Sequence, residues 1–403
     1  MILYSEHIYL EQRKIAGYIT IEKGKITEVS PQKPIGKKII DYRDYLIIPG
    51  YMDIHIHGWG TGGFWSERNV ESLVAMKKQL PLTGVTSFLG TTGTDSLERI
   101  YTCIDAASTT VVNQNSGDGA ELLGVHLEGP FINKKFRGMQ KEEYCIDPDL
   151  EIMRSFVTRA KQHNLIKFMT IAPELPNAKA VISYCKSQGI QCSIGHSGAT
   201  FDEIKATKDY GIGGVIHMFS GMQGLHHREL GVAGSAMYFA DLYCEFAKQT
   251  GQTVRHEAFD IIYRLKGSDR IYLTTDCVAL AKMDRKFHHY IRGETFNPLG
   301  SGMVEVTKDN GEKYLLNAND YESVKDLELS YEESVRNLVK HTNVTPFDVI
   351  KMTSTNPAKF IGVADRKGLL KEGYDADILI VDPTYKIKEV YCMGVPTFLT
   401  TKN

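Results

Sequence analysis

Short apolar runs alternate with longer amphipathic segments from about residue 50 to residue 280 of the chain. Eight of these runs have the length and the β-branched or aromatic content of buried strands, and the segments between them have the length of helices. This alternation is typical of parallel βα units, and eight units favour a TIM (β/α)8 barrel over an open sheet. The expected strands are residues 50–57, 84–92, 122–129, 166–173, 190–196, 214–219, 241–246 and 270–276.

The two ends of the chain have a different pattern, in which short β-prone runs are separated by turns. The runs are residues 15–21, 26–29, 38–40 and 45–48 near the start, and 376–381 and 387–393 near the end. The early runs predict a small antiparallel sheet, and the similar later runs suggest that both ends pair. We therefore expect a small β-sandwich domain from residues 1–49 plus 364–403, and a barrel from residues 50–363.

Residues 281–330 fit no βα unit, because polar runs there mix with β-like stretches, and they predict a hairpin or lid. After them, residues 331–341 and 345–361 have helical patterns. Ser330 and Thr345 precede these patterns and are suited to cap the two helices.

Composition narrows the class of partner. The chain has 403 residues, 42% of them hydrophobic, and a net charge of −2, so it lacks the basic character that nucleic-acid or anionic-membrane binding requires. Its seven cysteines are scattered and never form a CxxC pair, which suits reduced thiols. Its first residues show no basic segment leading into an apolar run, and no apolar run has membrane length, so we expect neither secretion nor membrane insertion. We expect a cytoplasmic protein with a small-molecule partner.

Chemically active residues follow the ends of several predicted strands. In a TIM barrel the carboxyl ends of the strands meet at one mouth, so residues far apart in sequence become neighbours there. Taken alone, a histidine at such a position is more often bonded to a backbone carbonyl than to a metal. Four histidines and a glutamate at the same end reverse those odds. The five are His55, His57, Glu128, His196 and His217.

The His55-Ile56-His57 spacing has a direct geometric consequence. Side chains two apart on a strand point to the same side, so both imidazoles can reach one cation. With one carboxylate and two more histidines, the set suits Zn²⁺, or Fe²⁺ or Mn²⁺, and it allows either one ion or two. Asp276 ends the eighth strand and is not needed as a ligand. A carboxylate there can accept a proton from water and pass it to a leaving nitrogen.

At this point the chain resembles the amidohydrolase superfamily, and within it the N-acetylglucosamine-6-phosphate deacetylase family, over nearly its whole length. HLEGPFI and LHHRE are specific to this branch, whereas HxH and GYDADILI are shared more widely. The matching stretches are IIPGYMDIHIHG (47–58), GVTSFLGTT (84–92), GVHLEGPFIN (124–133), TIAPE (170–174), IGHSGATFDEIKA (194–206), HMFSGM (217–222), LHHRELG (225–231), LTTD (273–276), STNPAKFIGV (354–363) and KGLLKEGYDADILIVD (367–382).

The resemblance implies a metal-dependent deacetylase of an amino-sugar phosphate, working as a homodimer. Glu128, His196 and His217 would hold the principal metal, and His55 and His57 would complete a second position. Asp276 would be the general base and acid. Arg228 would bind the substrate phosphate, in its own or in the neighbouring subunit, helped by backbone amides near Ser220 and Gly221.

Departures from the family pattern lie on the substrate side. Ser220 and Gly221 replace the family's Asn and Ala, and Met139 and Gln140 stand where Ala and His or Gln are common. The family's substrate-binding His after strand seven is missing, so either Gln252 substitutes or His256 reaches in from the next helix. The L-A-G-S loop is replaced around residues 326–330. These changes leave the sugar open, with N-acetylgalactosamine 6-phosphate as an alternative.

Two other functions remain compatible with the residues. One is a different amidohydrolase reaction, such as N-acyl-amino-acid deacylation or heterocycle deamination, neither of which requires a basic phosphate contact such as Arg228. The other is a noncatalytic metal-binding homologue. Asp276→Asn would preserve ligand binding in both an enzyme and such a homologue, but only an enzyme would lose turnover.

Overall fold

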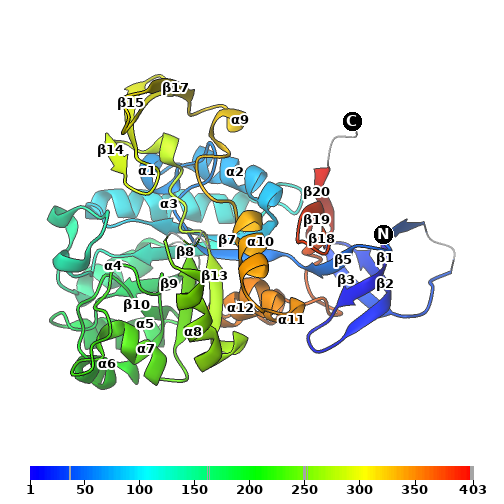
Figure 1. The fold of residues 1–403 in the computed structure, drawn as a ribbon, viewed down its shortest axis with the longest axis horizontal. Helices are drawn as coiled ribbons and strands as arrows, with labels where there is room; N and C mark the ends of the chain where they lie inside the picture. Colours follow the sequence, from blue (N-terminus) through cyan, green and yellow to red (C-terminus); the bar gives the residue numbers. More distant parts are fainter. Residues whose placement is uncertain (36–37, 161, 163, 248–250, 252, 400–403) are drawn as a thin grey trace.

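In the computed structural model, eight parallel strands form a barrel, and helices alternate with them along the chain (Figure 1). The structure describes residues 1–35, 38–160, 162, 164–247, 251 and 253–399. The predicted TIM barrel is confirmed. Its strands, in order around the sheet, are β6 (Tyr51–Ile56), β7 (Val85–Thr92), β8 (Glu121–Glu128), β9 (Ile166–Ile171), β10 (Gln191–Ile194), β11 (Ile212–Val215), β12 (Tyr243–Ala247) and β13 (Ile271–Thr274).

The barrel closes where the segment that follows β13 pairs with the end of β6 and the residue after it. The Asp276 N–H donates to the His55 carbonyl at 2.8 Å, and the His57 N–H donates to the Cys277 carbonyl at 2.8 Å. Closure thus occurs at the residues for which the sequence predicts chemistry, and it places the end of β6 against the end of β13.

Strand β11 is shorter at its carboxyl end than predicted. We expected a strand through residue 219, but β11 ends at Val215, and both His217 and Phe219 have positive φ angles, 27° and 76°. Such angles interrupt the extended backbone of a strand. His217 therefore lies on the turn after the strand.

The helices that follow the strands pack outside the barrel wall. The predicted N-caps are confirmed, because Ser330 and Thr345 each form a capping box, with Glu333 and Asp348. The helices are α1 (Phe64–Glu67), α2 (Val70–Gln79), α3 (Leu97–Asn113), α4 (Leu150–Arg159), α5 (Ala178–Ser187), α6 (Phe201–Lys208), α7 (Gly231–Tyr238), α8 (His256–Lys266), α9 (Tyr321–Val324), α10 (Tyr331–His341), α11 (Pro346–Ile350) and α12 (Asn356–Phe360).

The helix predicted over residues 345–361 is not regular. A π-helical stretch, Lys351–Thr355, separates α11 from α12. Pro357 stands in the first turn of α12, and its ring would clash with the carbonyl of residue 353 in a regular α-helix. The wider turn before it accommodates this proline.

The strands from both chain ends form one sheet beside the barrel, where the blue and red ribbons of Figure 1 meet. The prediction of an antiparallel sheet is wrong in one respect, because β1 pairs in parallel with β4 and β5. After β3 the chain returns to the other edge of β1 in the same direction. The strands are β1 (Ile2–Tyr9), β2 (Lys14–Glu22), β3 (Lys25–Ser30), β4 (Ile39–Asp41), β5 (Leu46–Pro49), β18 (Ile378–Val381), β19 (Ile387–Cys392) and β20 (Val395–Leu399).

This sheet has its own apolar core, which contains side chains from both ends, such as Ile19 of β2 and Ile380 of β18. The pairing of both ends follows from the backbone hydrogen bonds between β5 and β18. The domain boundaries at 49/50 and 363/364 stay a prediction.

The segment predicted as a hairpin or lid contains a four-stranded antiparallel sheet, seen in yellow in Figure 1. Its core includes Phe296 and also Trp65 of α1. The Arg285 guanidinium donates to the Met139 carbonyl at 2.9 Å, so the segment contacts the loop after β8. Its strands are β14 (Phe287–His289), β15 (Glu294–Gly300), β16 (Met303–Lys308) and β17 (Lys313–Asn317). Among the described helices, none has both the length and the apolar character needed to cross a membrane.

A buried ion cluster joins the barrel to the terminal sheet. The Lys367 ammonium, 1% exposed, lies 2.6 Å from Glu121 at the start of β8, 3.0 Å from Asp375 and 2.5 Å from Asp377. Burial would lower the pKa of Lys367, but these three carboxylates raise it above its ordinary value. The pKa of Glu121 is lowered, because Arg366 and Lys367 outweigh the effect of burial.

We expect Lys367→Met to lower the free energy of unfolding by about 3–5 kcal/mol at neutral pH, because it removes the cation that pairs with the buried Asp377, whereas Glu121 and Asp375 keep Arg366. Glu121 has a lowered pKa, so its contribution is present above the unfolded pKa and is lost as the pH falls through the folded one. The difference in the free energy of unfolding between variant and wild type should therefore become smaller below about pH 4. Denaturant unfolding at several pH values measures it.

Lys351→Met is the matched control. Lys351 pairs with Asp269 at 2.7 Å at the surface, with 37% and 72% of the two side chains exposed. Its loss should change the free energy of unfolding by no more than about 1 kcal/mol. Equal losses in both variants would contradict a stabilising role of the buried cluster.

Candidate metal centre

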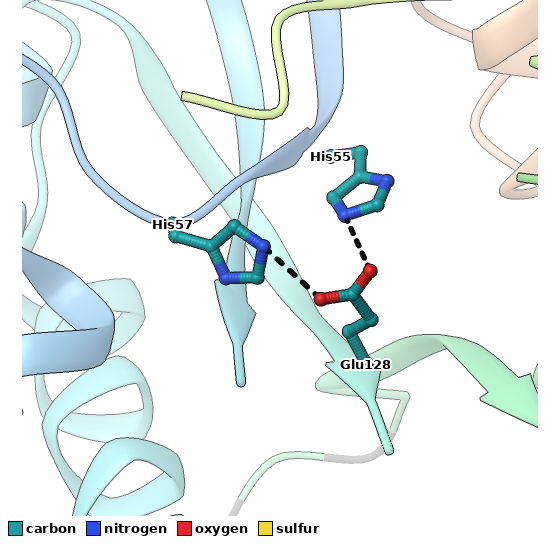
Figure 2. Close-up of side chains that lie close together, drawn as sticks. All are labelled: His55, His57 and Glu128. Carbon is teal, nitrogen blue, oxygen red and sulfur yellow. Dashed lines mark ion pairs between the residues drawn. The ribbon is translucent and has the colours of Figure 1, made fainter. Parts of the chain in front are cut away.

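The five predicted ligand residues meet at the carboxyl ends of the barrel strands, and all five are buried. His55 is in β6 and His57 follows it, Glu128 ends β8, and the other two histidines follow β10 and β11. Figure 2 shows His55 and His57 pointing at the two oxygens of the Glu128 carboxylate. The sequence prediction that these side chains are neighbours therefore agrees with the structure.

Three residues of the centre share the same backbone conformation. His196, His217 and Asp276 each lie two residues beyond the end of a strand, and their φ angles are 48°, 27° and 49°. The left-handed region is unfavourable for non-glycine residues, so it persists only where the surrounding structure enforces it. The shared bend brings all three side chains to the centre.

Two groups of side chains at the centre could hold a metal ion, and Glu128 belongs to both. In the first group, His55 Nε2 lies 3.4 Å from Glu128 Oε1 and His57 Nε2 lies 3.2 Å from Oε2. In the second, the Nε2 atoms of His196 and His217 lie 3.0 Å and 3.3 Å from Oε1. One carboxylate thus bridges two sets of imidazoles.

The other ring nitrogens explain why the Nε2 atoms are suited to a cation. Nδ1 of His196 donates to the Phe136 carbonyl at 2.9 Å, and Nδ1 of His217 donates to the Ser220 carbonyl at 3.0 Å. Because these oxygens only accept, Nδ1 carries the proton and Nε2 presents a lone pair. The two Nε2 atoms are 3.3 Å apart, an arrangement that a shared cation stabilises.

Charge at the centre also favours a cation. Burial would raise the pKa of Glu128, but the neighbouring His55 and His196 hold it well below its usual range. Burial would lower the pKa of His55, but Glu245, Asp276 and Glu128 raise it well above its usual range. These three carboxylates need compensating positive charge, which protons or a bound cation supply.

Asp276 lies beside the first group without belonging to either one. Its Oδ1 is 3.5 Å from His55 Nε2 and 3.4 Å from His57 Nε2, and 30% of its side chain is exposed. A carboxylate in this position can exchange protons with a molecule at the centre while remaining open to the barrel mouth.

Gln140 and Met139 lie on the loop after β8. The Gln140 amide donates to Glu128 Oε2 at 2.6 Å, and its oxygen accepts from the Thr94 N–H at 2.8 Å. The expected place of Gln140 on the substrate side of the site therefore stays a prediction. Met139 is 42% exposed, and its place on the substrate side stays a prediction as well.

Gly221 meets a local requirement that explains its residue type. Its φ is 58°, and a Cβ there would lie 3.1 Å from His196 Nδ1. A larger residue would be strained and would crowd the imidazole. Ser220 supplies the carbonyl that orients His217, so both residues support the histidines as well as being candidates for substrate contact.

The remaining predicted substrate residues either lie away from these contacts or are not among the residues that the structure describes. Arg228 is on an exposed stretch, where its Nε donates to His227 at 3.2 Å. Gln252 lies outside the described residues, so its proposed substitution stays a prediction. His256 stacks on His341 with 4.5 Å between ring centroids.

Sequence reasoning missed Glu245 as a site residue. It lies in the middle of β12, is fully buried, and its Oε1 accepts from His55 Nδ1 at 2.8 Å. The available signal was a carboxylate within a run of otherwise apolar strand residues. His126 is a second barrel-interior histidine, but its ring nitrogens contact Thr91 and Thr170, and it packs on Phe168.

Comparison with known proteins places these observations in context. A model described as "Amidohydrolase family" matches residues 46–397. An N-acetylglucosamine-6-phosphate deacetylase of Bacillus subtilis is 31% identical over 95% of this chain and 93% of its own length. An N-acetylgalactosamine-6-phosphate deacetylase of Escherichia coli O157:H7 is 30% identical over 90% of both chains. A crystal structure of N-acetylglucosamine-6-phosphate deacetylase from Thermotoga maritima superposes with a TM-score of 0.80 at 26% identity, covering 99% of this chain and 100% of that one.

Proposed function

We propose, on the premise that this chain belongs to the amidohydrolase family and within it to the N-acetylglucosamine-6-phosphate deacetylases, that it hydrolyses N-acetylglucosamine 6-phosphate to glucosamine 6-phosphate and acetate. The observation that carries the proposal is the convergence of four imidazoles on the bridging carboxylate of Glu128, with Asp276 beside them. This arrangement supports hydrolysis of an amide rather than a binding function alone.

His55, His57 and Glu128 would hold one divalent cation, and Glu128, His196 and His217 another. The orientation of the Nε2 lone pairs supports this assignment, and the nitrogen and oxygen donors suit Zn²⁺, with Fe²⁺ or Mn²⁺ as alternatives. When bound, such a cation supplies a Lewis acid that makes water a better nucleophile and polarises a carbonyl. We propose zinc, with two ions per subunit.

Asp276 would move the proton that the reaction requires. As the water oxygen bonds to the acetamide carbon, Asp276 accepts the proton that the water loses. As the bond between that carbon and the sugar nitrogen breaks, protonated Asp276 returns the proton to the nitrogen. The immediate products are acetic acid and the amine, which become acetate and the ammonium form when the second water proton is exchanged, and Asp276 regains its initial charge.

N-acetylgalactosamine 6-phosphate is the second candidate substrate. The relative from Escherichia coli O157:H7 named for that substrate is about as similar to this chain as the relative named for the glucosamine compound. The departures at Ser220 and Met139 also fall on the substrate side, whereas the metal and proton-transfer residues match the family. The two sugars differ at one hydroxyl, so side chains near the sugar would decide between them.

Acetate release from the 6-phosphates of N-acetylglucosamine, N-acetylgalactosamine and N-acetylmannosamine tests the proposal and identifies the sugar. The zinc-loaded protein should convert one of them with a higher kcat/KM than the others. Failure to convert any of the three by a protein shown to contain zinc would contradict a deacetylase of these sugar phosphates.

Arg228 is the proposed phosphate contact, in a homodimer where it would reach the site of the partner subunit. Its exposure in the single chain leaves the guanidinium available for such a contact. We expect Arg228→Ala to lower kcat/KM by about 10–100-fold, since charge-assisted hydrogen bonds contribute roughly 1.5–3 kcal/mol. The loss should appear mainly in KM.

Arg154→Ala is the matched control, because Arg154 is an exposed arginine that pairs with Glu151 at 2.7 Å on the outer helix α4. It should leave KM unchanged. An unaffected KM in Arg228→Ala as well would contradict the phosphate role and favour a substrate without phosphate. Size measurement by light scattering checks the homodimer.

A cytoplasmic location completes the proposal. The seven cysteines all lie in the described part of the chain, where they are buried and form no disulfide, which supports a protein that keeps its thiols reduced. Fractionation of the cells that produce the protein would test the location.

A further inference from the structure

Glu245 is a buried carboxylate that the proposed reaction does not use. It lies within β12, its side chain is fully buried, and its neighbours in the strand are apolar. Its Oε1 accepts two hydrogen bonds, from His55 Nδ1 at 2.8 Å and from the His217 backbone N–H at 3.2 Å. Burying a charge is costly unless it is compensated, so such a residue in a barrel interior calls for a role.

We infer that Glu245 is a positioning residue, which fixes the orientation and tautomer of His55 and thereby sets the metal affinity of the His55–His57 position. A carboxylate accepts but does not donate, so it holds the proton of His55 on Nδ1. Nε2 is then left without a hydrogen-bond partner and faces Glu128 at 3.4 Å. The inference rests on the metal centre of the proposed function.

The negative charge of Glu245 adds to this effect. A carboxylate that accepts from a metal-binding imidazole makes the other ring nitrogen a stronger donor. Neutral glutamine would keep the size and an acceptor oxygen but would lose this charge. A substitution to glutamine therefore separates the electrostatic contribution from simple packing.

The contact with His217 links Glu245 to the second group as well. There it binds the backbone N–H, while the imidazole of His217 is oriented independently by the Ser220 carbonyl at 3.0 Å. Loss of charge at Glu245 should therefore weaken the His55–His57 position much more than the His196–His217 position. This asymmetry distinguishes positioning of one ligand from a general structural role.

Zinc titration of the full-length protein against a chelating competitor tests the inference. We expect wild type to bind two Zn²⁺ per chain, and Glu245→Gln to weaken one of the two by about 10–100-fold while the other stays within a few-fold. In a His55→Ala background, Glu245→Gln should have little further effect on zinc binding, because the two residues act together. Zinc content after dialysis gives an independent count.

Glu121→Gln provides the matched control, because Glu121 is also a carboxylate on a barrel strand but pairs with Lys367 at the opposite end of β8. It should lower thermal stability without changing either zinc affinity. Two unchanged zinc sites in Glu245→Gln would overturn the inference, and so would equal weakening of both. A wild type that binds no zinc would overturn the proposed metal centre itself.

A measurement on wild type tests the inference even if the Glu245 variant folds poorly. With ¹⁵N-labelled histidine, the zinc-loaded protein should show His55 protonated at Nδ1, with the signal assigned by its loss in His55→Ala. An unprotonated Nδ1 would overturn the inference without use of any Glu245 variant.

Discussion

Asp276→Asn is expected to retain both metal positions and to lose about 10²–10⁴-fold in kcat, the range in which a positioned acid or base contributes. Asp276 belongs to neither ligand group, so metal content should not change. Asparagine also tolerates the left-handed backbone at this position, where φ is 49°. The variant should therefore fold but be unable to accept a proton. Acetate release and zinc content on the same preparation measure both effects.

Asp284→Asn controls for the removal of a carboxylate from a nearby loop. The Asp284 side chain is 31% exposed, close to the 30% of Asp276, but it pairs with Arg99 instead of facing the histidines. It should retain full activity. Full activity in Asp276→Asn would assign the proton transfer to another group, and loss of zinc would make Asp276 a ligand. If neither wild type nor Asp276→Asn released acetate, the result would support the noncatalytic alternative.

Glu128→Gln is expected to have the other large effect, because Glu128 is the only described residue shared by both groups. A structural zinc ion binds with a free energy of roughly 10–16 kcal/mol, which about four ligands share. Loss of one ligand should therefore lower the zinc affinity by on the order of 10²-fold at each position. The carboxylate also carries the low pKa that the imidazoles impose. Activity should fall at least as far as in Asp276→Asn, and zinc should be lost on dialysis.

Glu294→Gln tests whether any buried carboxylate has this effect. Glu294 is 6% exposed and contacts Arg292 and Tyr314 in the four-stranded sheet outside the barrel. It should retain both zinc ions. If Glu128→Gln also retained two ions at wild-type affinity, the bridging role would be wrong.

The barrel could be predicted because its signal is local and repeated. Strand β7, for example, is buried along its whole length, and its β-branched, aromatic and small residues suit such a strand whatever the rest of the fold does. Helix starts were predictable for a similar reason, since Ser330 meets Glu333 within one turn of α10. The missed features depend on distant partners. The strand β1 lies between β2 and β5 and mixes parallel with antiparallel pairing, and nothing within eight residues determines those neighbours.

The site shows the same division. His55 and His57 could be assigned to one side of a strand from their spacing alone. Their convergence with Glu128 was predictable once a barrel was assumed, because barrel strands end at a common mouth. Glu245 escaped prediction, since its partner His55 is separated from it by 190 residues.

The sequence by itself determined the residue types of the centre, the order of the strands that carry them, and the family to which the chain belongs. Only the tertiary structure decided which nitrogen of each histidine faces the centre, that Glu128 bridges two groups, and that Glu245 supports one of them. The reason is physical: periodicity and spacing act over a few residues, whereas tautomer, charge balance and the left-handed turns at His196, His217 and Asp276 depend on contacts between strands far apart in sequence.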